Sequence, residues 1–191
     1  FMDKFLEFAQ AESSLFSTES QTFDLINTIQ LVLKNNENII NDKNLTINID
    51  FENLSKKTIY SDESAIKRIL QNILETSIKL TDVGSITIKA DHPEMEIVEK
   101  CGAKIVSPAE SRSYIRIAIS DTGMGLAESE LEGIFEPYTQ LDKSNKKTIV
   151  RSITLGIAYT ILKRMGGAIW VESEVMKGST FYIIIPLEKE I

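Results

Sequence analysis

An amphipathic helix predicted between residues 62 and 80 constrains the fold of this chain more than any other single feature. Ser61 and Asp62 precede it and can cap its first turn. The residues of its inward face recur every three or four positions, as helical periodicity requires: Ile66, Ile69, Leu70, Ile73, Leu74, Ser77 and Ile78. Such a face is stable only when it is buried, so the helix predicts an apolar layer elsewhere in the chain.

Predicted strands supply that layer. Alternating or continuous runs of apolar residues mark strands at 45–51, 58–60, 85–90, 114–120, 168–172 and 179–185. A further helix follows Asp24, which can cap it, and another runs from about Ile153 to Met165, before Gly166 and Gly167. Because strands and helices do not alternate strictly, we expect the α+β class, a two-layer sandwich in which about three helices cover one face of a mixed sheet.

Polar side chains gather on the opposite face of the 62–80 helix. Asn72, Glu75, Thr76 and Lys79 lie three or four residues apart and therefore project together. Amide, carboxylate, hydroxyl and ammonium groups on one face are compatible with a phosphate and metal site. They are equally compatible with a solvated helix surface, and the spacing alone leaves both interpretations open.

The residues after the strand at 114–120 form a second candidate site. Asp121-Thr122-Gly123-Met124-Gly125-Leu126 places one carboxylate and two glycines at the end of that strand. The carboxylate can accept a hydrogen bond from an amino group of a ligand, and glycine lets the backbone approach that ligand closely. An isolated Asp-Gly pair after a strand is usually only a turn, so the motif depends on its context.

Composition excludes several classes of protein. The net charge of −7 over 191 residues argues against a nucleic-acid surface, although a basic stretch at 143–151 departs from that average. No apolar run is long enough to span a membrane and no secretory signal is visible, so we expect a cytoplasmic fragment whose parent protein can be membrane-anchored. Cys101, the single cysteine, excludes an internal disulfide. His92, the single histidine, lies in a polar segment at 91–113 and has no partners for a zinc site.

Five stretches in a fixed order carry a resemblance to a known family. They are 72–81, similar to an N box written NLLxNAxKFT; 121–126, similar to a first glycine box written DxGxG; 135–138, similar to an F box; 152–159, in the place of a second glycine box written GxGLGLAI; and the ending at 166–181. Together they resemble the ATP-binding catalytic domain of sensor histidine kinases, in the superfamily shared by gyrase, Hsp90 and MutL. The resemblance covers about residues 22–187 and implies the Bergerat-type ATP-binding fold.

The resemblance also implies the division of the chain and the roles of its residues. Residues 1–21 resemble the end of a dimerisation and phosphoacceptor helix with its linker, and residues 22–191 resemble the catalytic domain. At the adenine end, the resemblance implies that Asp121 accepts the amino group, that Gly123 and Gly125 let the backbone approach the ring, and that Thr180 supports the adenine. At the phosphate end, it implies that Lys79 and Arg151 contact the phosphates and that Leu155 and Gly156 belong to the second glycine box. Asn72 and Thr76 are the implied Mg ligands. The implied cofactors are ATP and Mg.

This sequence departs from the family pattern at the phosphate end. Thr76 stands where the family has its main magnesium ligand, an asparagine, and its hydroxyl reaches less far than an amide. Glu75 is an alternative carboxylate ligand or an ordinary surface residue. Ser152 and Thr154 replace glycines whose amides approach the triphosphate, and Ser152 is expected to cap a helix that begins at Ile153.

Two functions follow from this comparison. The first is transfer of the ATP γ-phosphate to a histidine outside the fragment, because His92 follows the N box and does not match the family's phosphoacceptor. The implied partners are the dimerisation and phosphoacceptor helices of the same parent, expected to be a homodimer, and a downstream response regulator. The alternative is a pseudokinase module that binds nucleotide weakly or without metal and acts by docking to a protein.

Overall fold

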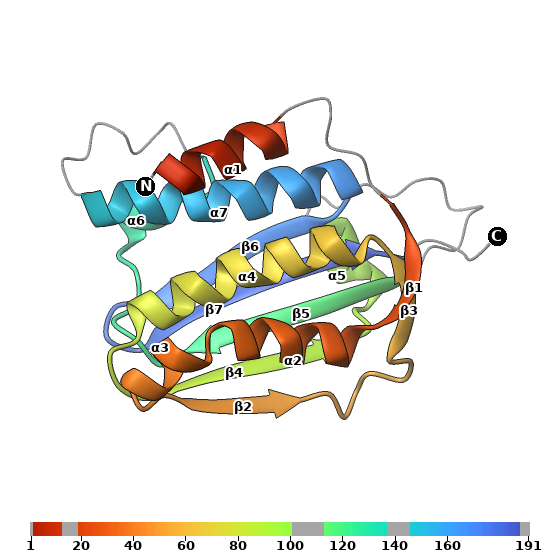
Figure 1. Cartoon of the computed structure of the whole chain (residues 1–191), viewed down its shortest axis with the longest axis horizontal. Coiled ribbons are helices and arrows are strands. Elements are labelled where there is room, and N and C mark those ends of the chain that lie inside the picture. Colours follow the sequence, from red (N-terminus) through yellow and green to blue (C-terminus); the bar gives the residue numbers. More distant parts are fainter. Residues whose placement is uncertain (1, 13–18, 101–112, 137–145, 188–191) are drawn as a thin grey trace.

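The computed structural model describes residues 2–12, 19–100, 113–136 and 146–187, and a five-stranded mixed sheet forms its centre (Figure 1). Its strands, in spatial order, are β2 (Thr46–Asp50), β4 (Ser85–Asp91), β5 (Tyr114–Asp121), β7 (Gly178–Pro186) and β6 (Ala168–Glu174). β2 and β4 are parallel, and the other neighbours are antiparallel. A separate antiparallel ribbon pairs β1 (Gln21–Asp24) with β3 (Thr58–Ser61).

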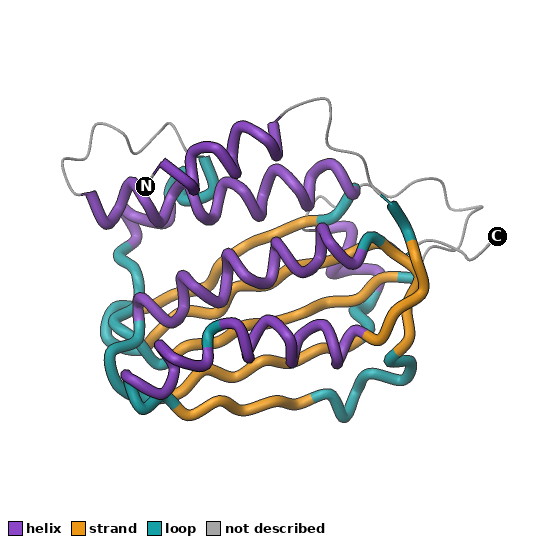
Figure 2. The backbone as a smooth tube through the Cα atoms, in the orientation of Figure 1, coloured by secondary structure: helices purple, strands orange, loops and turns teal. Residues whose placement is uncertain are grey.

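A layer of helices covers one face of this sheet (Figure 2). It consists of α2 (Leu25–Asn35), α4 (Glu63–Leu80) and α7 (Lys146–Met165). The core lies between the layers, where Ile73 of α4 and Phe181 of β7 are both fully buried in one apolar cluster. The expected α+β sandwich is therefore confirmed. The short helix α5 (Met95–Lys100) packs Val98 against a smaller cluster that includes Tyr114 and Ile184.

Side-chain caps fix the first turns of two of these helices. Asp24 accepts hydrogen bonds from the amides of Ile26 (2.8 Å) and Asn27 (3.1 Å) at the start of α2. Asp62 accepts from the Ala65 amide at 2.8 Å at the start of α4. An aspartate at this position satisfies backbone N–H groups that have no partner within the helix, so both predicted starts are confirmed.

The helix α7 differs from its prediction. It begins at Lys146 and passes without a break through Ser152, which lies inside the helix and is fully buried. The expectation that Ser152 caps a helix starting at Ile153 is therefore wrong. Two further turns of helix precede that point, and apolar periodicity gave no sign of them because the stretch from 143 to 151 is mostly polar and basic, with only Ile149 and Val150 apolar.

Several smaller elements were not predicted either. β1 lies at the end of the expected linker, and three short helices, α3 (Glu37–Asp42), α5 and α6 (Glu128–Leu131), lie in expected loops. Residues 101–112 of the polar segment at 91–113 lie outside the described residues, as do Lys143 and the Pro137-Tyr138 part of the F box.

The N-terminal helix α1 (Met2–Glu12) lies against the helical layer and not against the sheet (Figure 1). Its residues Phe8 and Ala11 are buried. At its C-terminal end, the Arg164 guanidinium on α7 donates a 2.6 Å hydrogen bond to the Glu12 carbonyl oxygen. α1 is thus fastened to α7 by apolar burial and by a cap on its last turn. Among the described residues, no helix is both apolar enough and long enough to cross a bilayer.

Candidate nucleotide site

The carboxylate of Asp121 is the best-defined polar group inside the sandwich. It stands at the end of β5, is only 5% exposed, and points to the same face of the sheet as the core residues Ile119 and Phe181. One oxygen, Oδ1, accepts from the amides of Gly123 at 3.0 Å and Ser179 at 3.2 Å. The other, Oδ2, is buried and has no hydrogen-bond partner among the residues that the structure describes.

Burial raises the pKa of Asp121, while hydrogen bonds from the Gly123 and Ser179 amides and the nearby Ser77 hydroxyl act in the opposite direction. The Ser77 Oγ, on α4, is likewise buried, and it lies near Asp121 without forming a well-aligned hydrogen bond to it or to another residue in the described part of the chain. Buried polar atoms are normally satisfied, so two unsatisfied oxygens at one place indicate a missing hydrogen-bonding ligand. An acceptor beside a hydroxyl suits a group that carries an amino function.

Thr180 does not lie with Asp121. β5 and β7 pair with Asp121 opposite Ser179 and with Ser120 opposite Thr180, so Thr180 points to the other face of the sheet. Its hydroxyl donates a 3.0 Å hydrogen bond to Ser120 Oγ there. The expected role of Thr180 in supporting the adenine therefore conflicts with the geometry. Ser179, which sequence reasoning passed over, is buried on the Asp121 face.

The two glycines of the 121–126 loop are required by its packing. Gly123 lies so close to the Leu80 carbonyl that a Cβ would collide with it, and Gly125 has φ +65 and lies against the Glu174 backbone. The Met124 amide donates to the Leu80 carbonyl (3.1 Å), and its carbonyl accepts from the Met176 amide (2.8 Å). The loop is thus held between the end of α4 and the β6–β7 turn. The glycines alone do not indicate a ligand, because the turn itself needs them.

Asn72 and Thr76 are buried on the polar side of α4, and both are engaged. Asn72 is fully buried; its Nδ2 donates to the Arg68 carbonyl at 2.8 Å and to Glu7 Oε1 at 3.2 Å, and its Oδ1 accepts from the Lys4 ammonium at 2.9 Å. The Thr76 hydroxyl donates to the Asn72 carbonyl at 3.0 Å, along its own helix. The interpretation of this face as a solvated surface is therefore wrong for these two residues.

Glu75 and Lys79 complete the polar face of α4. Burial raises the pKa of Glu75, but the hydrogen bond from Gln71 and the charges of Lys4 and Lys79 outweigh it and hold that pKa below its usual value. The Lys4 and Lys79 ammonium groups lie 3.2 Å and 3.6 Å from Glu75 Oε2. The Lys79 side chain is 54% exposed and is free to reorient toward solvent.

The second glycine box lies within the continuous helix α7. Leu155 and Gly156 are buried, and Arg151 donates to Glu130 Oε1 of α6 at 2.7 Å. In a continuous helix each amide binds the carbonyl four residues before it, so the amides of this segment are not directed at a ligand. α7 packs against α4. The structure thus buries Leu155 and Gly156 within α7 and pairs Arg151 with α6.

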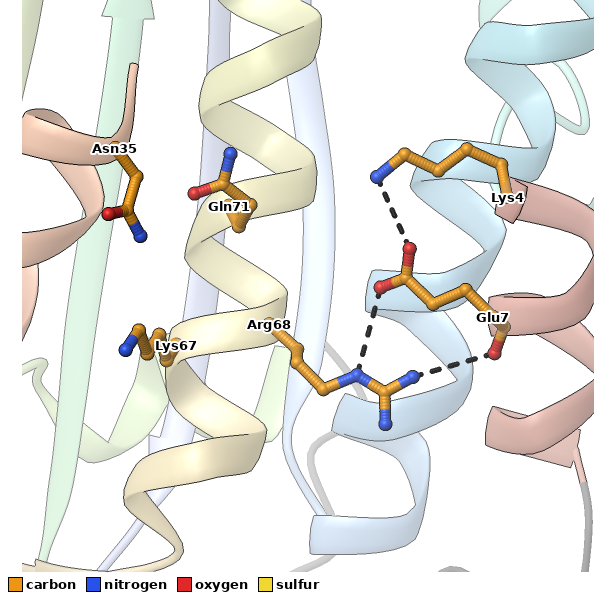
Figure 3. A pocket seen from close by; sticks show the side chains of 6 residues that line it. All are labelled: Lys4, Glu7, Asn35, Lys67, Arg68 and Gln71. Carbon is orange, nitrogen blue, oxygen red and sulfur yellow. Dashed lines mark hydrogen bonds and ion pairs between the residues drawn. The ribbon is translucent and has the colours of Figure 1, made fainter. Parts of the chain in front are cut away.

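A groove of about 300 Å³ opens beside α1 and α4 (Figure 3). Its lining residues are Lys4, Glu7, Asn35, Lys67, Arg68 and Gln71. The Glu7 carboxylate lies 3.2 Å from the Lys4 ammonium and 3.7 Å from Arg68 Nε, so one acid partly neutralises two bases. Among the described residues, no cluster of three or more His, Cys, Asp and Glu side chains has the arrangement of a metal site.

Comparison with known proteins identifies the family. Residues 61–189, from the end of β3 through β7, match the family described as histidine kinase-, DNA gyrase B- and HSP90-like ATPase. The chain belongs to this family. The matched segment contains Asp121, Ser77 and the polar face of α4, so the unsatisfied oxygens lie inside an ATP-binding domain. The comparisons give no support to the pseudokinase alternative.

Sequence relatives narrow the branch to sensor kinases. The chain is 28% identical over 190 residues to the autoinducer 2 sensor kinase/phosphatase LuxQ of Vibrio vulnificus, covering 98% of this chain and 21% of that protein. It is 29% identical over 188 residues to the peroxide stress-activated histidine kinase mak2 of Schizosaccharomyces pombe, covering 97% of this chain and 8% of that protein. The chain therefore corresponds to the ATP-binding catalytic domain of a sensor histidine kinase and spans a small part of these relatives.

Solved structures share the fold. Full-length ShkA in complex with AMPPNP has a TM-score of 0.76 at 21% identity, covering 98% of this chain and 35% of that one. The nucleotide-free catalytic domain of the histidine kinase ThkA has a TM-score of 0.66 at 22% identity, covering 88% of this chain and 95% of that one. Both likenesses establish the α+β sandwich of this ATPase family for the chain.

Proposed function

We propose that this domain binds ATP and supplies its γ-phosphate to a histidine on a helix of its parent protein. The observation that carries the proposal is the Asp121 carboxylate, whose buried Oδ2 has no partner among the described residues. Asp121 begins the stretch that resembles the first glycine box of the family, and that resemblance implies recognition of the adenine amino group. The adenine amino group would donate to Oδ2, and Ser77 and Ser179 would flank it. Gly123 and Gly125 would form the wall of the loop.

The phosphates would extend from this point along the polar face of α4. Lys79 is exposed enough to turn from Glu75 to a phosphate. Leu155 and Gly156 would lie against the triphosphate, and Arg151 would leave Glu130 to reach it. Magnesium, when bound with ATP, would neutralise the phosphate charge for in-line transfer, and Asn72 supplies an amide oxygen suited to it. The residues of this chain contribute positioning and charge, since phosphoryl transfer needs little covalent chemistry from the protein.

The acceptor histidine lies elsewhere in this proposal. The ring of His92, the single histidine, donates through Nδ1 to the Tyr114 carbonyl at 3.1 Å, near the small cluster around α5. From the resemblance to sensor kinases, which the names of the relatives share, we propose an acceptor on dimerisation and phosphoacceptor helices of the parent protein. We also propose a homodimeric parent and a response regulator as the next phosphate acceptor. We also propose that the domain is cytoplasmic, whether or not the parent is membrane-anchored.

Labelled phosphate tests this activity directly. The longer parent protein, incubated with γ-labelled ATP and Mg²⁺, is expected to acquire a label that acid removes and base does not, as a phosphohistidine requires. The Asp121→Asn variant should acquire none. Tight ATP binding without any transfer in the longer protein would contradict the kinase proposal.

A further inference from the structure

One ammonium group occupies a cation position formed by oxygens of α4. Lys4 Nζ lies 2.9 Å from Asn72 Oδ1 and 3.2 Å from Glu75 Oε2. Both oxygens come from the same helix, three residues apart, and they converge on a single positive charge. A third oxygen, Glu7 Oε2 of α1 itself, lies 3.2 Å from the same nitrogen. An amide oxygen and a carboxylate are ligands that Mg²⁺ accepts, and in nucleotide sites it takes one or two such groups besides phosphates and water.

Thr76 does not take part in this arrangement. Its side chain is 2% exposed and its hydroxyl is committed to the Asn72 carbonyl at 3.0 Å, within the same helix. Glu75, by contrast, presents Oε2 to the cation position shared with Asn72, and its side chain keeps 22% of its surface exposed. The residue that replaces the expected asparagine is thus turned away, while its neighbour supplies the oxygen.

The helix α1 delivers Lys4 to this position. Phe8 and Ala11 bury the apolar face of α1, and Arg164 fastens its last turn. Glu7, one turn from Lys4, meets the Asn72 amide nitrogen and lies 3.7 Å from Arg68 Nε. While α1 is docked, both ends of the Asn72 amide are therefore occupied by α1 side chains.

We propose that Asn72 Oδ1 and Glu75 Oε2 form the divalent-cation site of the nucleotide pocket and that the Lys4 ammonium occupies it whenever α1 is docked. This inference rests on the proposed ATP-binding function. Cation binding and α1 docking then exclude each other, because a divalent ion and an ammonium group cannot share the same oxygens. α1 is an internal competitor of the metal, and its release is a precondition for binding of the Mg–ATP complex.

Calorimetric titration of ATP in excess Mg²⁺ and in EDTA measures the enhancement of affinity by metal. Lys4→Met keeps the length of the side chain but removes its charge, and it is expected to increase this enhancement about tenfold or more over the wild type, because the cation no longer competes with the ammonium group. The matched control is Lys67→Met, which removes a lysine on the side of α4 that faces α2 (Figure 3) and should leave the enhancement unchanged. Equal enhancement in the wild type, Lys4→Met and Lys67→Met proteins would overturn the proposal.

The ligand is identified in the Lys4→Met background, where α1 no longer depends on Glu75. There Glu75→Gln is expected to abolish the enhancement by Mg²⁺ while ATP binding in EDTA persists. Loss of the enhancement in Thr76→Val, with Glu75→Gln unaffected, would assign the metal to Thr76 and overturn the inference. Hydrogen exchange of residues 2–12 should rise with Mg²⁺ and ATP together and not with ATP in EDTA.

The same experiments separate this inference from the proposed function. Absence of ATP binding in both EDTA and Mg²⁺ would refute the function but leave the cation site open to test. Mn²⁺ alone, followed by electron paramagnetic resonance, is then expected to bind Lys4→Met more tightly than the wild type and to lose that gain when Glu75→Gln is added. Equal Mn²⁺ affinity in all these proteins would refute the cation site.

Discussion

The environment of Asp121 sets two opposing demands on one side chain. Burial disfavours its charge and raises its pKa, yet the charged form is the better acceptor for the amino group that the site is proposed to receive. A carboxylate that costs stability without a ligand and gains a hydrogen bond with one is a common property of functional sites.

We expect Asp121→Asn to separate stability from binding. The amide oxygen can still accept from Gly123 and Ser179, and no charge remains buried, so thermal stability at pH 7 should equal or exceed that of the wild type. Because the pKa of Asp121 is raised, its neutral form favours folding at low pH and this contribution is lost as pH rises through that pKa. The advantage of Asp121→Asn should therefore shrink on acidification, as measured by calorimetric unfolding. If the stability advantage of Asp121→Asn over the wild type were larger at pH 4 than at pH 7, this account would be contradicted.

The two faces of β7 provide a matched pair of substitutions. Ser179→Val places a larger apolar side chain beside Asp121 and should weaken ATP binding about tenfold or more, a loss typical of a blocked polar pocket. Thr180→Val changes the other face, where the hydroxyl meets Ser120, and should alter ATP affinity by less than about twofold. Equilibrium titration with ATP measures both, and the reverse ranking would show that Thr180 faces the nucleotide.

At the level of single residues, the roles of Asp121, Asn72 and Thr180 remain predictions, and the structure adds that Ser179, not Thr180, shares the sheet face of Asp121. The family motif offers two adjacent hydroxyl residues, and only the register with β5 decides which one shares the face of Asp121. Ser77 was counted among the inward residues of α4 and its hydroxyl was overlooked. Periodicity reports burial, but it does not report whether a buried hydroxyl finds a partner.

At the scale of elements, α7 determines whether the phosphate end is open. α7 continues through the second glycine box, so the backbone amides there are committed to hydrogen bonds within the helix. Phosphate binding at a helix N-terminus needs those amides free, so α7 would have to begin later in the nucleotide-bound domain. Ser152 and Thr154, in place of glycine, stabilise the continuous form by their higher helix propensity.

The double variant Ser152→Gly, Thr154→Gly tests this interpretation. Each glycine costs roughly 0.5 kcal/mol of helix stability relative to serine or threonine, so the helix should start later more often. We expect higher affinity for ATP together with a lower unfolding temperature, measured by titration and by calorimetry. Unchanged or weaker ATP binding in a folded variant would show that the start of α7 does not limit access.

The elements that the sequence predicted are those that bury an apolar stripe. α2, α4 and the central strands were found because periodicity and caps agree, as at Asp24 and Asp62. The first turns of α7 were missed because most of their residues are polar. The short helices were missed because an element of so few residues shows no recognisable apolar periodicity. α7 also packs against α4 and α1, and no local sequence signal reports such tertiary contacts.

At the scale of the whole molecule, α1 packs on the outer side of the helical layer, against α7. Its residues Lys4 and Glu7 line one side of the groove beside α4, and Phe8 is buried. A movement of α1 would therefore reach Asn72 and Glu75 directly, through Lys4 and Glu7.

Weakening the docking of α1 should therefore change the domain as a whole. Phe8→Ala removes a buried aromatic ring, a loss of about 3 kcal/mol when a ring is fully enclosed. We expect faster hydrogen exchange in residues 2–12 and tighter binding of Mg–ATP. Leu6→Ala is the control, since Leu6 on the same helix is 55% exposed and should have little effect. If neither Phe8→Ala nor Leu6→Ala binds Mg–ATP more tightly than the wild type, then α1 does not oppose nucleotide binding.

The most direct test of the central claim compares ATP with inosine triphosphate, which carries a carbonyl oxygen in place of the adenine amino group. If Asp121 Oδ2 receives that amino group, calorimetric titration should show ATP binding and inosine triphosphate binding at least about tenfold more weakly, because two acceptors would face each other. Asp121→Asn should reduce or reverse this preference. Equal affinity for the two nucleotides in the wild-type domain would contradict the proposed adenine site.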